Sequence, residues 1–350
     1  MPDQPAPEPP TPPGPPKHNI LISIPRTASN LLTHLLALPS QPSILRHPHD
    51  GYFFLPALVH RLQHNTLTQP YTESLETQSS PETPSLDTAL RTSASAYEAF
   101  LLAADAQGKG TYIKEHVNWT LRPEIESAYL HPGQHSPLDP NPPLDPEQPP
   151  FNPTALPTSV WRRTQTTLLI RHPAQTVPSA LRTALANEGR AHVLTPESAA
   201  VMRWECSFRW HVLLYRFLQA LSRGGETPPP PSPPPPLILD ATHLLSPTLI
   251  SRYAHHTGLS PTPTLTSWPP ASASETQTMS PTELRMRDTL LASTGVVGAK
   301  LEGGGAGWEW EGERSGWEEE FGGELAGRVE GLVRAAVGDY EWLFARRWRG

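Results

Sequence analysis

The sequence has 350 residues and a formal net charge of −7, from 27 Lys and Arg against 34 Asp and Glu. A nucleic-acid-binding protein presents a basic face to the phosphates, so this balance excludes general nucleic-acid binding and requires any anion site to be local. The 45 prolines reduce the expected folded part to roughly 300 residues, because proline supplies no backbone donor. A single domain is the better expectation for a chain of this size.

Cysteine content and apolar runs predict the compartment. The single cysteine, Cys206, cannot form an internal disulfide, and its apolar surroundings predict a buried structural thiol in a reducing compartment. The first 17 residues lack the basic start and apolar run of a signal or transit peptide. No stretch approaches the ~18 consecutive apolar residues of a membrane span. We therefore expect a cytoplasmic protein that binds neither nucleic acid nor membrane.

Proline-rich and polar segments separate the periodic parts of the sequence. Residues 1–17 read as a disordered leader of the polyproline type. Segments 66–86, 131–159 and 225–236 are rich in Pro, Ser and Thr and are predicted to be flexible surface insertions. The remainder, residues 18–350, is expected to form one domain.

Short apolar runs alternate with helical patterns along the chain. Long connections between buried strands require a mainly parallel sheet, which predicts an α/β fold with helices on both faces and ligands at the carboxyl ends of the strands. A Gly- and Trp-rich stretch, 301–317, is predicted to be a loop. The predicted strands are 18–24, 111–114, 166–170 and 236–239, and the predicted helices include 29–38, 173–188, 247–257, 280–294 and 324–347.

The first motif is a polar loop, 25–30, between a predicted strand and a helix. Exposed amides and the positive end of the helix dipole would form an anion site there. Arg26 can add charge, and Ser29 and Asn30 can cap the helix or bind phosphate oxygens. The pattern GxxxxGK[ST] is absent, so the loop is not a Walker A sequence. An ordinary turn capped by Ser29 remains the alternative.

The second motif follows the strand 166–170. Arg171 emerges from the strand tip, and Ser179 lies eight residues later, about two helical turns along. The two side chains could share one anion. The alternative is an ion-pairing arginine and a serine that bonds back to its own helix.

The third motif is the pair Lys114 and His116, two residues apart at a strand end, where their side chains point to the same side. An imidazole can take a proton from an acceptor, and an ammonium can stabilise charge on a leaving oxygen. Glu115 should face the other way. A structural role for the histidine remains the alternative.

Taken together and in this order, the three motifs resemble those of sulfotransferases that use 3′-phosphoadenosine 5′-phosphosulfate. The family's P-[KR]-[ST]-G-[ST]-[ST] loop reads PRTASN here, closest to fungal sulfotransferase-like proteins with a PRTASNLL loop. Its R-x-P-x-x-x-x-x-S pattern is matched by Arg171 and Ser179, and its K-[ST]-H by residues 114–116. The resemblance implies a P-loop NTPase-like three-layer sandwich.

A weaker match extends to the C-terminus. Ser315, Gly316, Trp317 and Phe321 are similar to the family's G-D-W-K-x-x-F segment. The R-K-G that precedes this segment in the cytosolic branch is missing, and Lys300 is the nearest candidate. Residues 339–343, DYEWL, are similar to a DYE[WY]L segment of the fungal proteins.

Three loop residues depart from the family pattern. Ala28 replaces the usual glycine, which is tolerable only if its φ is below zero. Asn30 replaces Ser or Thr and keeps a donor with a different reach. Leu31 stands where the cytosolic branch has a tryptophan that stacks on adenine, so the base must be held in another way.

The resemblance implies transfer of a sulfuryl group from 3′-phosphoadenosine 5′-phosphosulfate to a hydroxyl or amine of an unknown small-molecule acceptor, without a metal. His116 would deprotonate the acceptor, and Lys114 would stabilise the bridging oxygen. Arg171 and Ser179 would select the 3′-phosphate. The 5′-phosphosulfate would be held by Arg26 and the amides of Thr27, Ala28, Ser29 and Asn30.

Two other functions remain open from the sequence. The first is a nucleotide-bisphosphate-binding interaction protein that has lost transfer activity. The second is a divergent P-loop kinase or NTPase, for which Asp240 is similar to a Walker B carboxylate. Residues 49–58, HDGYFFLPAL, belong either to the acceptor pocket or to the core. The sequence does not predict an oligomeric state.

Overall fold

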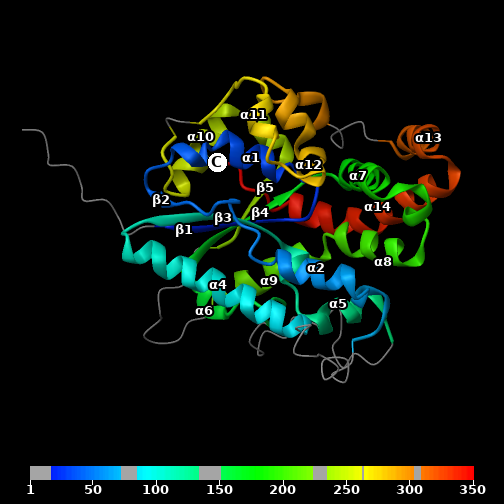
Figure 1. Ribbon diagram of the computed structural model, residues 1–350, viewed down its shortest axis with the longest axis horizontal. Coiled ribbons are helices and arrows are strands. Elements are labelled where there is room, and N and C mark those ends of the chain that lie inside the picture. The colour runs from blue at the N-terminus through cyan, green and yellow to red at the C-terminus, as the bar shows by residue number, and fades with distance from the viewer. Residues whose placement is uncertain (1–16, 72–84, 134–150, 224–234, 262–263, 303–308) are drawn as a thin grey trace, which may run out of the picture.

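The computed structural model describes residues 17–71, 85–133, 151–223, 235–261, 264–302 and 309–350 (Figure 1). The strands are β1 (His18–Ser23), β2 (Ile44–Leu45), β3 (Gly110–His116), β4 (Thr164–Ile170) and β5 (Leu237–Asp240). The helices are α1 (Ser29–Leu35), α2 (Leu55–Gln63), α4 (Leu86–Ala106), α5 (Pro123–Leu130), α6 (Thr158–Arg163), α7 (Pro173–Val193), α8 (Pro196–Glu205), α9 (Arg209–Arg223), α10 (Pro247–His256), α11 (Ala273–Thr276), α12 (Pro281–Ala292), α13 (Trp310–Phe321) and α14 (Gly323–Phe344). Short 3₁₀ helices span Leu38–Ser40, Thr66–Thr68, Val117–Thr120, Ala241–Leu245 and Gly298–Lys300.

The strands form one parallel sheet in the order β2-β3-β1-β4-β5. β1 is central and lies between β3 and β4. Because these three strands are parallel, their carboxyl ends meet at one edge of the sheet. This arrangement confirms the predicted α/β class and is consistent with a P-loop NTPase-like sandwich. Each of the three predicted motifs follows or ends one of these three central strands.

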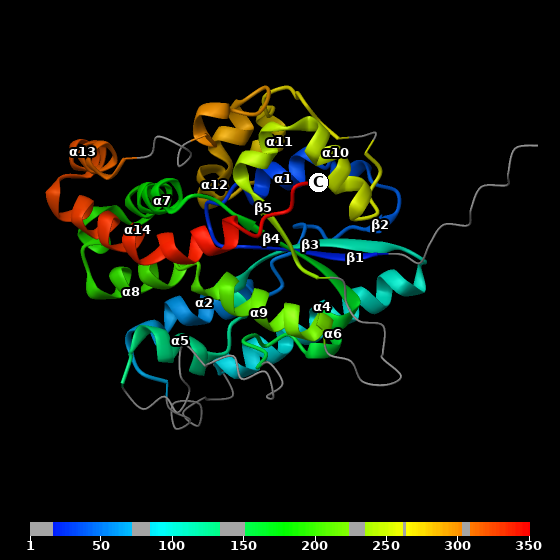
Figure 2. The ribbon, with the colours of Figure 1, turned by 180° about the vertical axis from the view of Figure 1, so that it is seen from behind.

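Both faces of the sheet are buried, because successive side chains of a strand point to opposite faces. Ile20 and Ile22 of β1 pack in one core cluster, whereas Leu21 packs in another. Leu168 and Leu169 of β4 divide in the same way. In Figures 1 and 2, α1, α10 and α12 cover one face, and α2, α4 and α9 cover the other.

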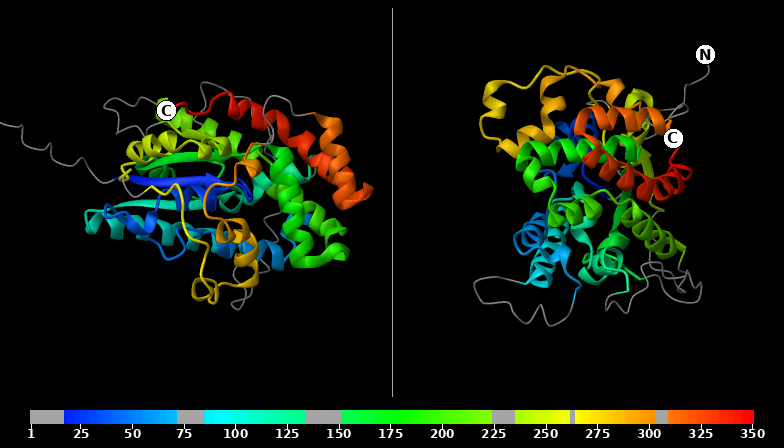
Figure 3. Two further views of the ribbon diagram at one scale, coloured as in Figure 1. Left: turned by 90° about the horizontal axis from the view of Figure 1, so that it is seen from above. Right: turned by 90° about the vertical axis from the view of Figure 1, so that its right-hand side faces the viewer.

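A third apolar cluster joins α7, α13 and α14 beside the carboxyl ends of the central strands (Figure 3). It contains Val177 and Leu181 of α7, Trp317 and Phe321 of α13, and Val333 of α14. Helix α7 carries Ser179 and begins directly after β4. The cluster packs this helix against α13 and α14 in the C-terminal part of the chain.

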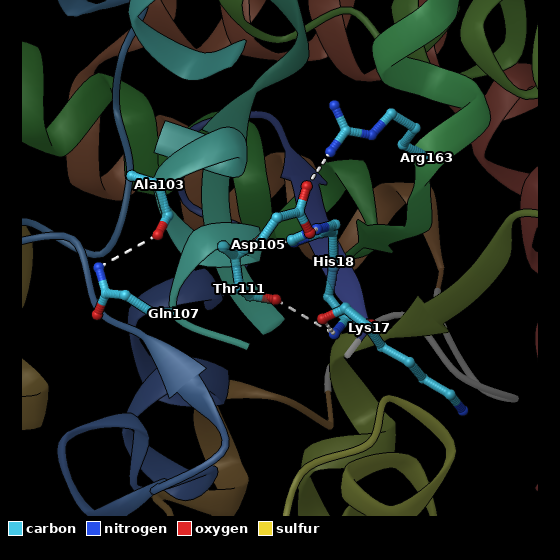
Figure 4. A network of polar contacts seen from close by, with 8 residues as sticks. Lys17, His18, Ala103, Asp105, Gln107, Thr111 and Arg163 are labelled. Carbon is cyan, nitrogen blue, oxygen red and sulfur yellow. Dashed lines mark hydrogen bonds and ion pairs between the residues drawn. The ribbon is translucent and has the colours of Figure 1, made fainter. Parts of the chain in front are cut away.

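The opposite, amino-terminal edge of the sheet is held by a polar network (Figure 4). His18, at the start of β1, contacts Asp105 through Nε2 at 2.8 Å and Thr111 Oγ1 through Nδ1 at 3.2 Å. Arg163 also pairs with Asp105. These contacts tie β1 to α4, β3 and α6, so that the two ends of the strands have different tasks: structure at one end and a cavity at the other.

The predicted strands are confirmed with small shifts of their ends, whereas the predicted loop 301–317 is partly wrong. Residues from Trp310 onward form α13, although glycines normally weaken helices. A side chain at Gly312 or Gly316 would meet no neighbouring atom, so these glycines do not lie on the packed face of α13. Trp317 and Phe321 are buried, and their packing stabilises the helix.

Some residues at the ends of the predicted insertions 66–86 and 131–159 are part of the fold. In 131–159, Thr154 and Leu156 are buried, and the Ala155 amide donates to the Thr120 carbonyl at 2.8 Å. Helix α6 begins at Thr158. In 66–86, Leu67 is buried and Leu86 begins α4. Residues 1–16, 72–84, 134–150 and 224–234, which hold the rest of the leader and the insertions, lie outside the described residues.

Candidate active site

The loop between β1 and α1 has two residues in the left-handed region, Arg26 and Ala28, both with φ of 69°. The expectation that Ala28 requires a negative φ is therefore wrong: the backbone keeps the conformation that favours glycine, although alanine occupies it. No side chain caps α1. The first amides of a helix have no intrahelical acceptors, so those of Ser29 and Asn30 are available to a bound anion.

Thr27 differs from the rest of the loop. Its side chain is buried, and its hydroxyl donates to the Ile24 carbonyl at 2.9 Å. It therefore fastens the loop to the end of β1 and leaves only its backbone amide for a ligand.

Arg26, Arg171 and Ser179 all line one cavity, and hydrogen bonds join them. Arg26 donates through Nε to Ser179 Oγ at 2.9 Å, and Arg171 donates to the Arg26 carbonyl at 2.9 Å. Arg171 also donates to Gln175 Oε1 at 3.0 Å. The motifs that follow β1 and β4 are thus joined by hydrogen bonds between their own side chains and backbone.

This cluster carries more positive than negative charge. Burial lowers the pKa of Arg26. Burial, followed by the charges of Arg26 and Arg182, lowers the pKa of Arg171 to about 10. Arg182 lies three residues after Ser179 on α7 and is paired with Glu320 of α13. Because guanidiniums held close together repel one another, a bound anion would relieve this repulsion.

His116 closes the carboxyl end of β3. Its Nδ1 lies 3.0 Å from Ser23 Oγ, so Nε2 is the ring nitrogen left for a ligand. Trp119 approaches the imidazole edge-on, with 4.6 Å between ring centroids. Burial, followed by the Lys114 charge, lowers the pKa of His116 to about 3. The imidazole is therefore neutral at physiological pH, which is the state that can accept a proton.

Lys114 lies one layer behind the cavity wall. Its ammonium donates to Asn30 Oδ1 and lies 4.6 Å from the centre of the Tyr52 ring. Glu115 faces the other way, as predicted, and accepts a hydrogen bond from the Phe53 amide. Burial raises the pKa of Glu115 to about 8.

A cavity of about 770 Å³ joins these residues. Its wall contains the loop residues other than Thr27, and it also contains His116, Arg171 and Ser179. From segment 49–58, Tyr52 lines the cavity, whereas Phe54 is fully buried in the core. Within this segment, Tyr52 therefore fits the interpretation as a cavity residue and Phe54 fits the interpretation as a core residue.

The sequence prediction missed the side of this cavity that α12 provides, although it named Lys300 and Trp317, which also line the cavity. Arg285, Arg287 and Asp288 of α12 line the cavity. Arg26 donates to the Met286 carbonyl at 3.3 Å, and Arg171 donates to the Lys300 carbonyl. The helix 280–294 was predicted, but its spacing gave no sign that it lies over the loop.

Asp240 does not have the surroundings of a Walker B carboxylate. One oxygen accepts from the Thr242 amide at 2.9 Å, and the other accepts from the Tyr340 hydroxyl at 3.0 Å. Asp240 thus caps a 3₁₀ helix and anchors α14, and it lies on β5, which is separated from β1 by β4. These contacts disfavour the kinase interpretation.

Two curated fungal proteins align with nearly the whole chain. Sulfotransferase ppzF from Metarhizium majus (strain ARSEF 297) is 31% identical over 346 residues, which cover 96% of this chain and 98% of the relative. Sulfotransferase ppzF from Metarhizium rileyi (strain RCEF 4871) is 31% identical over 351 residues, with the same coverage. The chain belongs to the sulfotransferase family. It is therefore a transferase, and the transferred group is a sulfuryl group.

Other comparisons add no further relatives to this sulfotransferase. No family model matches its sequence, and no solved structure matches it. Within the described parts of the chain, no group of three or more His, Cys, Asp and Glu side chains could hold a metal ion. None of the described helices is long and apolar enough to cross a membrane.

Proposed function

We propose that this sulfotransferase uses 3′-phosphoadenosine 5′-phosphosulfate as donor and sulfates a hydroxyl or amine of a small molecule. The observation that carries the proposal is the cluster of Arg26, Arg171 and Ser179 at the loop between β1 and α1. The backbone of this loop has positive φ at Arg26 and Ala28. Loop amides and two guanidiniums on one cavity wall suit a ligand with two separate anionic groups, such as a nucleotide 3′,5′-bisphosphate.

The proposed roles follow from the positions of the side chains. Arg26 and the amides of residues 27–30 hold the 5′-phosphosulfate, while Arg171 and Ser179 hold the 3′-phosphate. His116 lines the same cavity, and its Nε2, the ring nitrogen not bonded to Ser23, takes the acceptor proton. The acceptor oxygen or nitrogen forms a bond to sulfur as the bond from sulfur to the bridging oxygen breaks, so that adenosine 3′,5′-bisphosphate is the leaving group.

Rate acceleration in this site would come from alignment and charge neutralisation. A neutral imidazole needs no prior deprotonation, and buried cations act more strongly on developing charge than they would in water. The cavity volume leaves space for an acceptor beside the nucleotide. The reaction needs no metal, because the loop amides and guanidiniums supply the positive charge.

The direct test is transfer of radiolabelled sulfate from the donor to a panel of phenols, alcohols and amines. We expect the wild type to form labelled product, and His116→Ala to reduce kcat by at least about a hundredfold while donor affinity stays within a few-fold. His64→Ala, which removes an exposed imidazole, is the matched control. A fully active His116→Ala would remove this residue as the base, and absence of donor binding by the wild type would overturn the proposal.

A further inference from the structure

The turn Asp50–Tyr52 has three consecutive residues with positive φ, of 55°, 141° and 63°. Two of them are not glycine, and side chains disfavour this region, so the turn persists only because its surroundings hold it. A Cβ at Gly51 would lie 2.0 Å from the Lys114 carbonyl oxygen, which leaves glycine as the residue that fits. Strained backbone of this kind concentrates at functional sites.

The turn is clamped to the end of β3. The Tyr52 amide donates to the Lys114 carbonyl at 2.9 Å, and the Lys114 amide donates to the Asp50 carbonyl at 2.8 Å. Arg46 pairs with Asp50 at 3.0 Å. Gly51 therefore forms a parallel bridge with Lys114, in the manner of a short additional strand.

The result of this clamp is a fixed position for the Tyr52 ring. The ring lines the cavity, and the Lys114 ammonium lies over its face at 4.6 Å. The same ring lies 5.3 Å from the His116 ring and 5.2 Å from the Trp119 ring, measured between centroids. Tyr52 thus contacts Lys114 and His116 at once. Tyr52 lines the cavity wall whereas Lys114 does not, so the ring separates Lys114 from the cavity.

We propose that Tyr52 is a positioning residue of the transfer reaction, held by its strained turn so that the Lys114 charge is kept in a dry site beside His116. This inference rests on the proposed role of His116 as base. In this arrangement Lys114 acts on the reaction through the imidazole and through Asn30, which accepts its hydrogen bond. Cation–π contact with the ring replaces the water that an exposed ammonium would bind.

The groups that face His116 determine the sign of the expected effect. They are Lys114 of its own strand, Ser23 of β1, His211 of α9 and the Tyr52 ring. Burial and the Lys114 charge both lower the pKa of His116. Loss of the ring would admit water, and loss of the ammonium would remove repulsion, so either change raises this pKa towards its ordinary value of 6.5.

The test is a titration of His116 by NMR in protein labelled with ¹⁵N-histidine, which needs no acceptor. We expect Tyr52→Leu and Lys114→Met each to raise the pKa of His116 by at least about one unit. Tyr52→Phe keeps the ring face and should titrate like the wild type. Phe100→Leu is the matched control, because Phe100 belongs to the neighbouring aromatic group and contacts Phe53 rather than His116.

Activity gives a second readout, with 4-nitrophenol as the probe acceptor. Tyr52→Leu should lower kcat more than it raises KM, because the His116 ring loses the contact that orients it. The variant should also move the acid limb of the pH profile upward, and Tyr52→Phe should restore both. Gly51→Ala displaces the turn by a different route and should reproduce the titration change. Unchanged His116 titration in folded Tyr52→Leu and Lys114→Met overturns the inference. If wild type fails to bind adenosine 3′,5′-bisphosphate, the proposed function fails, whereas the titration still decides the role of Tyr52.

Discussion

The residue that departs most visibly from the family pattern is Ala28, with φ of 69° where glycine is usual. Holding alanine there costs about 1 kcal/mol. The loop tolerates this cost because the Thr27 side chain is buried and its hydroxyl is bonded to the Ile24 carbonyl. We do not expect a β-branched residue at this position, because its stiffer side chain would add to the strain.

This view of Ala28 leads to a prediction for the loop. Ala28→Gly should keep the affinity for adenosine 3′,5′-bisphosphate within about twofold, whereas Ala28→Val should weaken it at least about tenfold, because a further 1–2 kcal/mol of strain would displace the amides. Titration calorimetry measures both. Ala37→Val, at a buried residue with φ of 47° outside the cavity wall, should lower stability without changing this affinity. Equal affinity of Ala28→Val and wild type would show that the loop conformation is unimportant.

At the scale of elements, strand β3 directs alternate side chains to different tasks. Lys114 and His116 serve the cavity side, and Glu115 supports the Asp50–Tyr52 turn through the Phe53 amide. One strand end thus holds both the base and the turn that positions it.

The raised pKa of Glu115 predicts a pH-dependent stability. Its folded-state pKa of about 8 exceeds the ordinary 4.5. Protonated Glu115 therefore contributes to the free energy of unfolding at low pH, and this contribution is lost as pH rises through about 8. Gln keeps the acceptor for Phe53 but cannot ionise. Between pH 6 and 9, the unfolding free energy of wild type should fall by roughly 2–3 kcal/mol more than that of Glu115→Gln, measured with urea. Glu319→Gln, at an exposed position, should follow the wild type, and parallel curves for all three would refute the assignment.

The sequence predicted the elements that carry periodic apolar residues but not those defined by packing. The four predicted strands and the helices near 173–188 and 247–257 were found because their patterns are local. The two-residue strand β2 and helix α13 depend on neighbours that are distant in the sequence, and glycines mask α13. The local pattern of apolar residues therefore predicts the strands and the edge of the sheet that holds the site. It does not predict every element around them.

The candidate site shows the same division. Arg26, His116, Arg171 and Ser179 could be chosen because each ends or follows one of the strands whose carboxyl ends share an edge. The contribution of α12 could not, because nothing in its helical spacing shows which surface it covers. Lys114 was predicted from the same strand end as His116, but its position behind Tyr52 depends on a turn whose positive φ values follow from contacts with β3.

For the whole molecule, the parallel sheet separates stability from chemistry. The amino-terminal edge is closed by the His18, Asp105 and Arg163 network, and the carboxyl edge is left to the cavity (Figure 4). The wall of that cavity includes the loop after β1, helix α7 after β4, and α12. A ligand that binds both guanidiniums therefore links segments that are far apart in the sequence.

The central claim, a site for a nucleotide 3′,5′-bisphosphate, is tested most directly by calorimetric binding of adenosine 3′,5′-bisphosphate and AMP without magnesium. Wild type should prefer the bisphosphate by about 10- to 100-fold, as expected for charge-assisted hydrogen bonds to one phosphate. Arg171→Met should abolish this preference and leave AMP affinity within a few-fold, while Arg163→Met, at the opposite edge, should change neither. Equal losses for both nucleotides in Arg171→Met, or a wild type that binds them equally, would contradict the account.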